Sequence, residues 1–457
     1  MKVFNNFKII RYLNPTWYFN LQPDAEKNFS TCIFNSRYKN SFKGLDKSLK
    51  EDSEYSSTTA AELDAGYNLW NRGYLIYNNG TKSSLLNHEN KISAIDEYIF
   101  ARKYYSKKFV IYLLLRSIAG LTNPFKEIKS FFKTRNISKS DTIRMKAVYE
   151  SFNDFKSELV SSNPLVSIII PTLNRYEYLK DVLTDLEKQE YKNFEVVITD
   201  QTDTPDTAFY KKFSLNLNAV FQNEKGQWYA RNEAIKICKG TLLLFFDDDS
   251  RVEPDWITNH LKCLDYFNAD ISAGVSISVT GDKVPENYGY FRWADQFDSG
   301  NALVKKEVFV KAGMFDRQFD GQRMGDGEFG LRAYLSGFRS ISNPYAKRVH
   351  LKVGTGGLRQ MGSWDAFRPK NFFAPRPVPS VLYFFRKYFP TKNVIDALII
   401  RLLPSLIPYK WKGKKILYPL LIPAAIIFFP AILIQLAISW SKSTAMLRQG
   451  DKIEKLV

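Results

Sequence analysis

Three consecutive carboxylates, Asp247, Asp248 and Asp249, directly follow the apolar segment TLLLFF at residues 241–246. Adjacent acids repel one another unless water surrounds them or a positive charge lies between them. Carboxylate oxygens are the ligands that hard divalent cations prefer, and such an ion can also bind the phosphates of a nucleotide. The triplet therefore predicts a site for a divalent ion and a nucleotide diphosphate. A solvated loop with helix-capping acids is the alternative.

Polar residues also follow two other short apolar segments. Thr172 and Asn174 come after VSIII at residues 166–170, and Asp200 closes FEVVITD at residues 194–200. In open α/β sheets, ligands bind beyond the carboxyl ends of the strands. We therefore expect these three side chains to meet the acidic triplet at one edge of a sheet, where a carboxylate could bind a base or ribose.

The segments that would position these residues alternate between strand and helix patterns over residues 164–351. Strands are expected at residues 166–170, 194–200, 218–223 and 241–246. Residues 176–189 carry apolar side chains at helical spacing, and residues 230–240 form a second expected helix. This alternation predicts an α/β fold with a largely parallel sheet covered by helices on both faces.

The composition sets limits on the class of protein. The chain has 457 residues, of which 45% are apolar, so it can bury a large core and carry further segments. The three cysteines, Cys32, Cys238 and Cys263, match no zinc or disulfide spacing and suit a reducing compartment. The N-terminal segment MKVFNNFKIIRYLNP lacks the apolar core of a signal peptide. We therefore expect a protein that is cytosolic or faces the cytosol.

The net charge of +18 is concentrated toward the C-terminus. Residues 376–457 contain 13 Lys or Arg against 3 Asp or Glu, and they include the most apolar segment, residues 416–438. This segment is long enough to span a bilayer, but Pro419, Pro423 and Pro430 would interrupt a helix. We therefore expect a membrane-associated tail, peripheral or embedded, with lysines near anionic headgroups; a buried core helix is the alternative. Because no nucleic-acid-binding pattern is present, no nucleic-acid partner is expected.

Five motifs occur in order between residues 164 and 352. They are SIIIPTLNR, VVITDQTD, GQWYARNEAIKICKGTLLLFFDDD, GNALVKKEVFVKAGMFD and GDGEFGLRAYLSGFR. On these motifs the region resembles family 2 glycosyltransferases of the GT-A fold. The resemblance implies a Rossmann-like mixed sheet covered by helices. The predicted domains are a mainly helical region at 1–160, the GT-A domain at 161–372 and a basic, apolar helical tail at 373–457.

The resemblance also implies roles for residues at matching positions. Asp326 matches the catalytic base of inverting members, which takes the proton of the acceptor hydroxyl; an ordinary helix cap is the alternative. Asp249 and His350 match positions near Mn²⁺ or Mg²⁺, and a structural histidine is the alternative for His350. The nucleotide-sugar-binding candidates are Pro171, Thr172, Asn174, Asp200, Arg231, Asp247 and Asp248. For Arg231 a surface helix charge is the alternative. The acceptor-side candidates are Asn301 and Glu328.

Two departures from the family pattern are visible. Gly325 stands where a glutamate usually precedes the base, and Gln201 and Thr202 replace the usual Gly-Ser after the acid of the second strand. Residues 354–357, GTGG, followed by Trp364, form either a lid over the donor or a plain linker.

A weaker, partial copy of the end of this domain occurs near the N-terminus. Residues 62–74 align without a gap with residues 326–338, and residues 101–116 resemble residues 385–401. His88 falls where His350 does, with two extra residues. Three matches in one order favour a degenerate transferase remnant over residues 60–135, with convergent amphipathic helices as the alternative. Because no Asp-x-Asp motif precedes this copy, it is not a complete second active site.

Together these features predict a metal-dependent inverting glycosyltransferase that uses a nucleotide-diphosphate sugar. Its expected task is surface polysaccharide or glycolipid synthesis at the cytoplasmic face of the cell membrane, with a glycan or lipid-linked acceptor. One alternative is a catalytically inactive sugar-nucleotide-binding or scaffold protein of a membrane-bound polysaccharide assembly. Another is a nucleotidyltransferase that uses the same acids and releases pyrophosphate.

Overall fold

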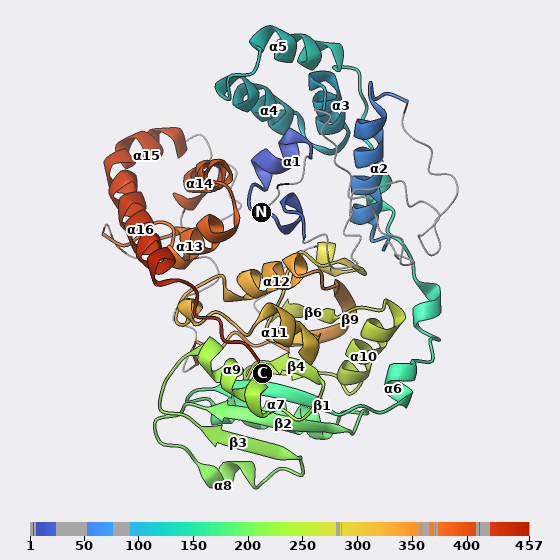
Figure 1. Cartoon of the computed structure of the whole chain (residues 1–457), viewed down its shortest axis with the longest axis vertical. Coiled ribbons are helices and arrows are strands. Elements are labelled where there is room, and N and C mark those ends of the chain that lie inside the picture. Colours follow the sequence, from blue (N-terminus) through green and yellow to red (C-terminus); the bar gives the residue numbers. More distant parts are fainter. Residues whose placement is uncertain are drawn as a thin grey trace. The chain divides into compact units, whose positions relative to one another are not determined.

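A computed structural model describes residues 3, 6–23, 53–75, 92–279, 284, 286–354, 357–358, 365–369, 371, 373–407, 411 and 421–456. By packing, the chain divides into two compact units (Figure 1). Unit 1 comprises residues 1–148 and 389–400, and unit 2 comprises residues 149–388 and 401–457. The domain limits predicted at residues 160 and 372 stay a prediction.

Within the described residues, unit 2 is built on a nine-stranded sheet. The strands are β1 Val166–Thr172, β2 Phe194–Asp200, β3 Leu217–Phe221, β4 Leu242–Phe246, β5 Ser250–Val252, β6 Ile271–Ser278, β7 Arg292–Trp293, β8 Asn301–Lys305 and β9 Ser340–His350. They follow the order β3-β2-β1-β4-β8-β6-β9-β5, and β7 pairs with β9. The pairs formed among β1 to β4 are parallel, whereas β8 is antiparallel to both of its neighbours. The sheet is therefore mixed.

Helix α6 precedes the first strand, and further helices lie between the strands along the chain. The helices are α6 Glu158–Ser161, α7 Tyr176–Glu187, α8 Thr207–Tyr210, α9 Gln227–Ile237, α10 Trp256–Tyr266, α11 Lys306–Ala312 and α12 Gly325–Leu335. Helix α9 packs on β1 and β2, and α10 packs on β6 and β9. The expected alternation of strands and helices is confirmed. Helix α9 begins earlier than residue 230 because Asp320 Oδ1 accepts the backbone N–H of Trp228 at 2.7 Å.

The C-terminal tail is helical, as predicted. Its helices are α13 Pro379–Tyr388, α14 Thr391–Ser405, α15 Leu421–Ile427 and α16 Phe429–Gln449. Pro430 lies in the first turn of α16, where a missing backbone N–H costs nothing, so this proline begins a helix rather than bending one. Residues 416–420 of the apolar segment lie outside the described residues. Among the helices that are described, none is both long enough and apolar enough to cross a bilayer.

The tail packs on the transferase-like part of unit 2. The Tyr383 hydroxyl of α13 donates to Asp316 Oδ2 at 2.8 Å. Gln318 Nε2 donates to the Met446 carbonyl of α16 at 2.7 Å. Helices α13 and α16 also pack on each other. These contacts join the tail to the segment that precedes α12.

The N-terminal region is helical, as predicted. Its described helices are α1 Lys8–Leu13, α2 Thr58–Arg72, α3 Ala94–Tyr104, α4 Lys107–Ala119 and α5 Pro124–Lys133. The core of unit 1 is aromatic: Phe7 stacks on Phe100 with ring centroids 3.8 Å apart, and both side chains are fully buried. The N-terminal region thus has a core of its own.

Helix ends in the two aligned regions fall at equivalent positions. Gly73 after α2 and Gly337 after α12 are aligned, and both have left-handed φ values, 85° and 86°. Helix α3 ends at Tyr104 and α4 begins at Lys107, while α13 ends at Tyr388 and α14 begins at Thr391. The alignment of residues 101–116 with residues 385–401 matches Tyr104 to Tyr388 and Lys107 to Thr391.

Buried ion pairs also recur in the two regions. Lys103 Nζ lies 2.7 Å from Asp64 Oδ2, and Lys387 Nζ lies 3.3 Å from Glu328 Oε1. The alignments place Asp64 at the position of Glu328 and Lys103 at that of Lys387. His88 lies outside the described residues. These equivalences favour the remnant hypothesis, which stays a hypothesis.

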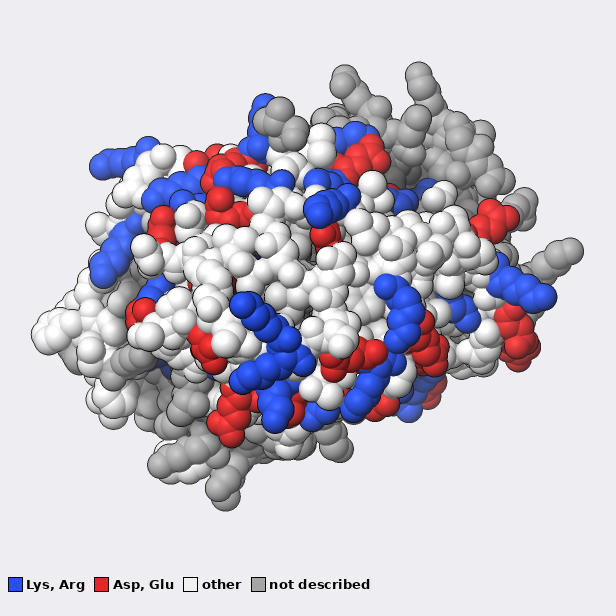
Figure 2. Space-filling view, turned by 90° about the horizontal axis from the view of Figure 1, so that it is seen from below, with Lys and Arg blue, Asp and Glu red and all other residues white. Residues whose placement is uncertain are grey.

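The excess of basic residues does not form a continuous basic field on the face seen in Figure 2. Basic and acidic side chains are interspersed there among apolar and neutral ones. Nucleic-acid backbones are bound by clustered Lys and Arg, so this face does not present that pattern.

Candidate active site

The acidic triplet forms the short link between β4 and β5. Strand β8 runs antiparallel to β4, with Asn301 opposite Phe246, so the loop at residues 298–300 lies beside Asp247. Strand β9 runs antiparallel to β5, with His350 opposite Ser250. Two strands from distant parts of the sequence therefore bring their ends to the triplet.

Side chains of the protein supply the positive charge that the triplet needs. Asp247 Oδ1 accepts from Arg231 Nη2, and Asp247 Oδ2 accepts from Arg348 Nη1, both at 2.7 Å. Arg175 Nη1 lies 3.0 Å from Asp248 Oδ1 and 3.2 Å from Asp249 Oδ2. Arginines of the protein therefore relieve part of the repulsion within the triplet, and the divalent ion stays a prediction.

The pKa values of Asp248 and Asp249 are shifted in opposite directions. Burial raises the pKa of Asp248 to about 6, which the charge of Arg175 only partly offsets. For Asp249, burial would raise the pKa, but the hydrogen bond from His350 and the charges of His350 and Arg175 hold it below its usual value. Asp249 is thus the acid of this pair better suited to remain ionised.

The triplet and His350 could hold a divalent ion. One ligand atom from each of Asp247, Asp249 and His350 lies within 4.8 Å of the others. Asp248 instead accepts from the Thr172 hydroxyl at 2.8 Å, so it faces away from this group. The two carboxylates are ligands that suit Mn²⁺ or Mg²⁺, and the imidazole adds a nitrogen ligand. The predicted pair Asp249 and His350 is therefore brought together, with Asp247 as a third possible ligand.

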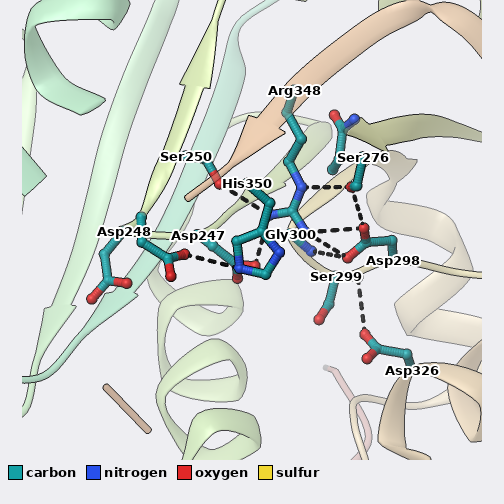
Figure 3. A network of polar contacts seen from close by, with 12 residues as sticks. Asp247, Asp248, Ser250, Ser276, Asp298, Ser299, Gly300, Asp326, Arg348 and His350 are labelled. Atoms are coloured by element: carbon teal, nitrogen blue, oxygen red, sulfur yellow. Dashed lines mark hydrogen bonds and ion pairs between the residues drawn. The ribbon is translucent and has the colours of Figure 1, made fainter. Parts of the chain in front are cut away.

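A continuous chain of hydrogen bonds joins Asp247 to Asp326. Arg231, which is fully buried, donates to Asp247 and also to the Ser299 carbonyl at 2.9 Å. The backbone N–H of Ser299 donates to Asp326 Oδ1 at 2.9 Å. Figure 3 shows Asp326 on the opposite side of Ser299 from the acidic triplet. Burial excludes the alternative that Arg231 is a surface helix charge.

A second arginine fixes the other side of Asp247. Arg348 lies between Asp247 and Asp298, and its Nη2 is 3.0 Å from Asp298 Oδ2 (Figure 3). Burial would lower the pKa of Arg348, but the charges of Asp298 and Asp247 raise it. Arg348 therefore stays charged and holds the loop at residues 298–300 against the triplet.

Asp200 lies at the carboxyl end of β2, as predicted, but it is buried. Its Oδ2 accepts from the hydroxyls of Tyr176 and Tyr210, and its Oδ1 accepts from the Thr202 N–H at 2.9 Å. The contact of Asp200 with a base or ribose stays a prediction, and it would require these tyrosines to share the carboxylate.

Pro171 and Asn174 lie at the end of β1. Pro171 is buried in the strand opposite Thr199 of β2. Asn174 is exposed and has a left-handed φ of 54°, and its backbone N–H donates to the Thr202 hydroxyl oxygen at 3.0 Å. Of these two nucleotide-binding candidates, Asn174 is therefore the one whose side chain lies at the surface of the site.

The acceptor-side role of Asn301 and Glu328 stays a prediction, and both side chains are fully buried. Asn301 Oδ1 accepts from Trp256 and its Nδ2 donates to the Val275 carbonyl, so it joins parts of the core. Glu328 forms two 2.9 Å hydrogen bonds with Arg332. Both residues are structural in this arrangement.

The two departures from the family pattern have structural explanations. A side chain at Gly325 would overlap the indole of Trp228, which occupies the space that a glutamate would need. Gln201 Oε1 accepts the Gly226 N–H at 2.9 Å, which ties the end of β2 to the start of α9. The substituted residues therefore serve the packing around the site.

Four residues of this network are absent from the predicted set. They are Arg175, Asp298, Ser299 and Arg348. Arg348 could have been found, since it lies two residues before His350 on the same face of a strand. Asp298 and Ser299 carry no local signal, because only the pairing of β8 with β4 brings them to Asp247.

The candidate lid is described only in part. Arg175 Nη2 donates to the Val353 carbonyl at 3.1 Å, and the Gly357 N–H donates to the Leu173 carbonyl at 2.8 Å. Residues 355–356 and Trp364 lie outside the described residues. Closure over a donor stays a prediction.

Comparison with known proteins identifies this part of the chain. Residues 167–316 match the model of the family described as Glycosyl transferase family 2. This region is a family 2 glycosyltransferase domain. The family and the mixed sheet with its covering helices confirm the predicted GT-A fold.

Several known proteins are similar to part of this chain. The poly(ribitol-phosphate) beta-N-acetylglucosaminyltransferase TarS of Staphylococcus aureus is 28% identical over 128 residues, which are 26% of this chain and 22% of TarS. A PGL/p-HBAD biosynthesis glycosyltransferase of Mycobacterium bovis is 26% identical over 215 residues, covering 44% of this chain and 78% of that protein. A crystal structure of TarS residues 1–349 with UDP-GlcNAc has 18% identity and a TM-score of 0.41, covering 62% and 92% of the two chains. The sequence alignment with TarS thus spans only about a fifth of the length of TarS.

Proposed function

We propose that this protein transfers a sugar, with inversion, from a nucleotide-diphosphate donor to a hydroxyl of a glycan or lipid-linked acceptor. The observation that carries the proposal is the series of hydrogen bonds from Asp247 through Arg231 and Ser299 to Asp326, which starts within the family 2 match at residues 167–316 and ends just beyond it. These hydrogen bonds link the candidate phosphate and ion site at Asp247 to Asp326, the candidate catalytic base. The names of the relatives, which refer to poly(ribitol-phosphate) and PGL/p-HBAD biosynthesis, support an envelope polysaccharide or glycolipid as the product.

Each residue then has a chemical task. Asp326 takes the proton of the attacking hydroxyl, and the Ser299 N–H holds its carboxylate in place. Arg231 and Arg348 hold Asp247, while Asp249 and His350 lie where they can bind Mn²⁺ or Mg²⁺. When bound, the ion would supply charge neutralisation for the leaving diphosphate. With the catalytic base and the ion on opposite sides of the sugar, the acceptor hydroxyl attacks the anomeric carbon from the side opposite the leaving diphosphate, which inverts its configuration.

The test is product release from a panel of nucleotide sugars, with Mn²⁺ or Mg²⁺ and without metal. We expect nucleoside diphosphate, and we expect Asp326→Asn to lower turnover by roughly 10² to 10⁴-fold. Glu62→Ala, at the aligned position of the partial repeat, is the matched control and should keep its turnover. Release of pyrophosphate would instead indicate a nucleotidyltransferase. Donor binding without turnover would indicate an inactive binding or scaffold protein.

We also propose that the tail associates with the cytoplasmic face of the cell membrane. At the junction of α15 and α16, four consecutive apolar residues, Ile426 to Phe429, are 54% to 72% exposed. Exposed apolar side chains of this kind, in a tail with a net charge of +10, suit the headgroup region of an anionic bilayer. Replacing Phe428 and Phe429 with serine should weaken the binding of the protein to anionic vesicles; unchanged binding would contradict the assignment.

A further inference from the structure

Helix α5 has its polar side turned inward and its apolar side turned outward. Glu127 and Ser130 are 3% and 7% exposed, whereas Phe125 and Phe132 are 83% and 61% exposed. A surface helix of a globular protein normally shows the reverse pattern. Phe125, Ile128 and Phe132 are spaced so that they form one stripe along the helix.

Hydrogen bonds fix this orientation. Glu127 Oε2 accepts from the Tyr98 hydroxyl at 2.9 Å, and Glu127 Oε1 lies 3.2 Å from Lys8 Nζ. Rotating α5 to bury its phenylalanines would break both contacts and leave Tyr98, which is fully buried, without this acceptor. The exposed apolar stripe is therefore a property of the packed unit.

Helix α4 and the turn before α5 extend the apolar surface. Ile111 and Leu115, one turn apart on α4, are 48% and 62% exposed. Leu121 in the turn is 96% exposed and has a left-handed φ of 60°, which leucine rarely adopts. Helices α4 and α5 pack on each other within unit 1 (Figure 1). We call residues 107–139, which carry these side chains, the α4–α5 hairpin.

The charges of the hairpin identify the kind of partner. It contains eight Lys or Arg and one acid, and that acid is the buried Glu127. Its exposed charged side chains are all positive: Lys107, Lys108, Lys126, Lys129, Lys133, Arg135 and Lys139. Protein interfaces are depleted in lysine, whereas lysines that flank an apolar helix face suit anionic lipid headgroups.

We propose that the α4–α5 hairpin docks on an anionic lipid bilayer, with Leu121, Phe125 and Phe132 entering the headgroup region and the lysines contacting phosphates. This gives unit 1 a membrane-binding surface, and it does not depend on the catalytic assignment. It is also separate from the tail, because the hairpin belongs to unit 1 and the α15–α16 junction to unit 2.

The test is co-sedimentation of the full chain with vesicles of phosphatidylcholine alone and with vesicles that also contain phosphatidylglycerol. The Phe428→Ser/Phe429→Ser protein serves as the background, so that the tail does not mask the hairpin. In this background we expect binding to anionic vesicles, and a loss of about tenfold or more on adding Phe125→Ser and Phe132→Ser. Replacing Lys126, Lys129 and Lys133 with glutamate should have a similar effect.

Ile237→Ser with Val310→Ser is the matched control, because these apolar side chains are 42% and 51% exposed in unit 2. This variant should bind vesicles as the background protein does, and thermal melting should show that all variants are folded. Equal binding to neutral and anionic vesicles, or binding unchanged by the hairpin substitutions, would overturn the proposal. So would a concentration-dependent dimer that the phenylalanine substitutions dissociate without any change in lipid binding.

Discussion

At the scale of single residues, the centre of the site leaves no room for a side chain at position 300. A Cβ atom on Gly300 would overlap both Arg348 Nη1 and Asp247 Oδ2. Gly300→Ala should therefore part the Arg348–Asp247 ion pair and lower turnover by about tenfold or more, since small misplacements of binding groups are costly. Gly289→Ala, where a Cβ meets only an ordinary contact, is the control. Equal turnover of both variants in a donor-release assay would argue against this role for the ion pair.

Glu97 makes the stability of the chain depend on pH. Burial raises its pKa from 4.5 to about 7, although its Oε2 accepts the Lys8 N–H at 2.7 Å. Between these pH values the native state holds a proton that the unfolded chain releases. The stabilisation is therefore complete below pH 4.5 and is lost as the pH rises through about 7. The free energy of unfolding falls by ~3 kcal/mol at most.

The corresponding substitution is Glu97→Gln, which cannot titrate. Urea unfolding at pH 5 and pH 8 should show a smaller loss of the free energy of unfolding on raising the pH in the variant than in the wild type. An identical pH dependence in both proteins would show that Glu97 ionises in the native state near its ordinary pKa.

At the scale of elements, the sequence predicts the strands well and the site only in part. VSIII, FEVVITD and TLLLFF are short apolar runs that can only be buried strands in such a context, and all three are strands. The acids directly after a strand could likewise be placed, because parallel strands end at one edge of a sheet. Arg231 could be placed from its motif and Arg348 could be suspected from its spacing to His350, but the contact of Arg348 with Asp247 depends on the pairing of β5 with β9, which has no local signature.

Asn301 shows a related limit of local sequence patterns. Its position at the start of β8 suggests an edge residue, yet its side chain points into the sheet core and bonds Trp256 and the Val275 carbonyl. An asparagine that lies at a strand end can face either the ligand or the core. Only the three-dimensional packing decides between them.

The two equivalent ion pairs make a controlled comparison of elements possible. Asp64→Asn should remove the carboxylate charge that pairs with the buried Lys103 and lower the free energy of unfolding by about 3 kcal/mol, with turnover retained. Glu328→Gln should also destabilise the protein and should in addition lower turnover, because Glu328 shares helix α12 with Asp326. Chemical unfolding of both variants measures the loss of stability, and release of nucleoside diphosphate from the donor measures turnover. A turnover loss of equal size in both would refute the remnant hypothesis.

At the scale of the whole molecule, the tail is expected to be part of the folded unit rather than an independent appendage. Helix α13 donates to Asp316 through Tyr383 and reaches Glu328 through Lys387, so removing it would leave two buried acids without these partners. A chain that ends at residue 372 should therefore melt at a clearly lower temperature or fail to fold. A truncated protein with the melting temperature of the full chain would instead support the predicted boundary at 372.

The most direct test of the catalytic account is Mn²⁺ binding, followed by electron paramagnetic resonance, with a nucleoside diphosphate present. We predict that the wild-type chain binds the ion and that Asp249→Ala weakens binding by at least about tenfold. Asp203→Ala, which removes an exposed acid paired with Lys225, should bind Mn²⁺ as the wild type does. Equal Mn²⁺ binding by the wild type and Asp249→Ala would contradict the account, because the ion and the diphosphate would then lie elsewhere.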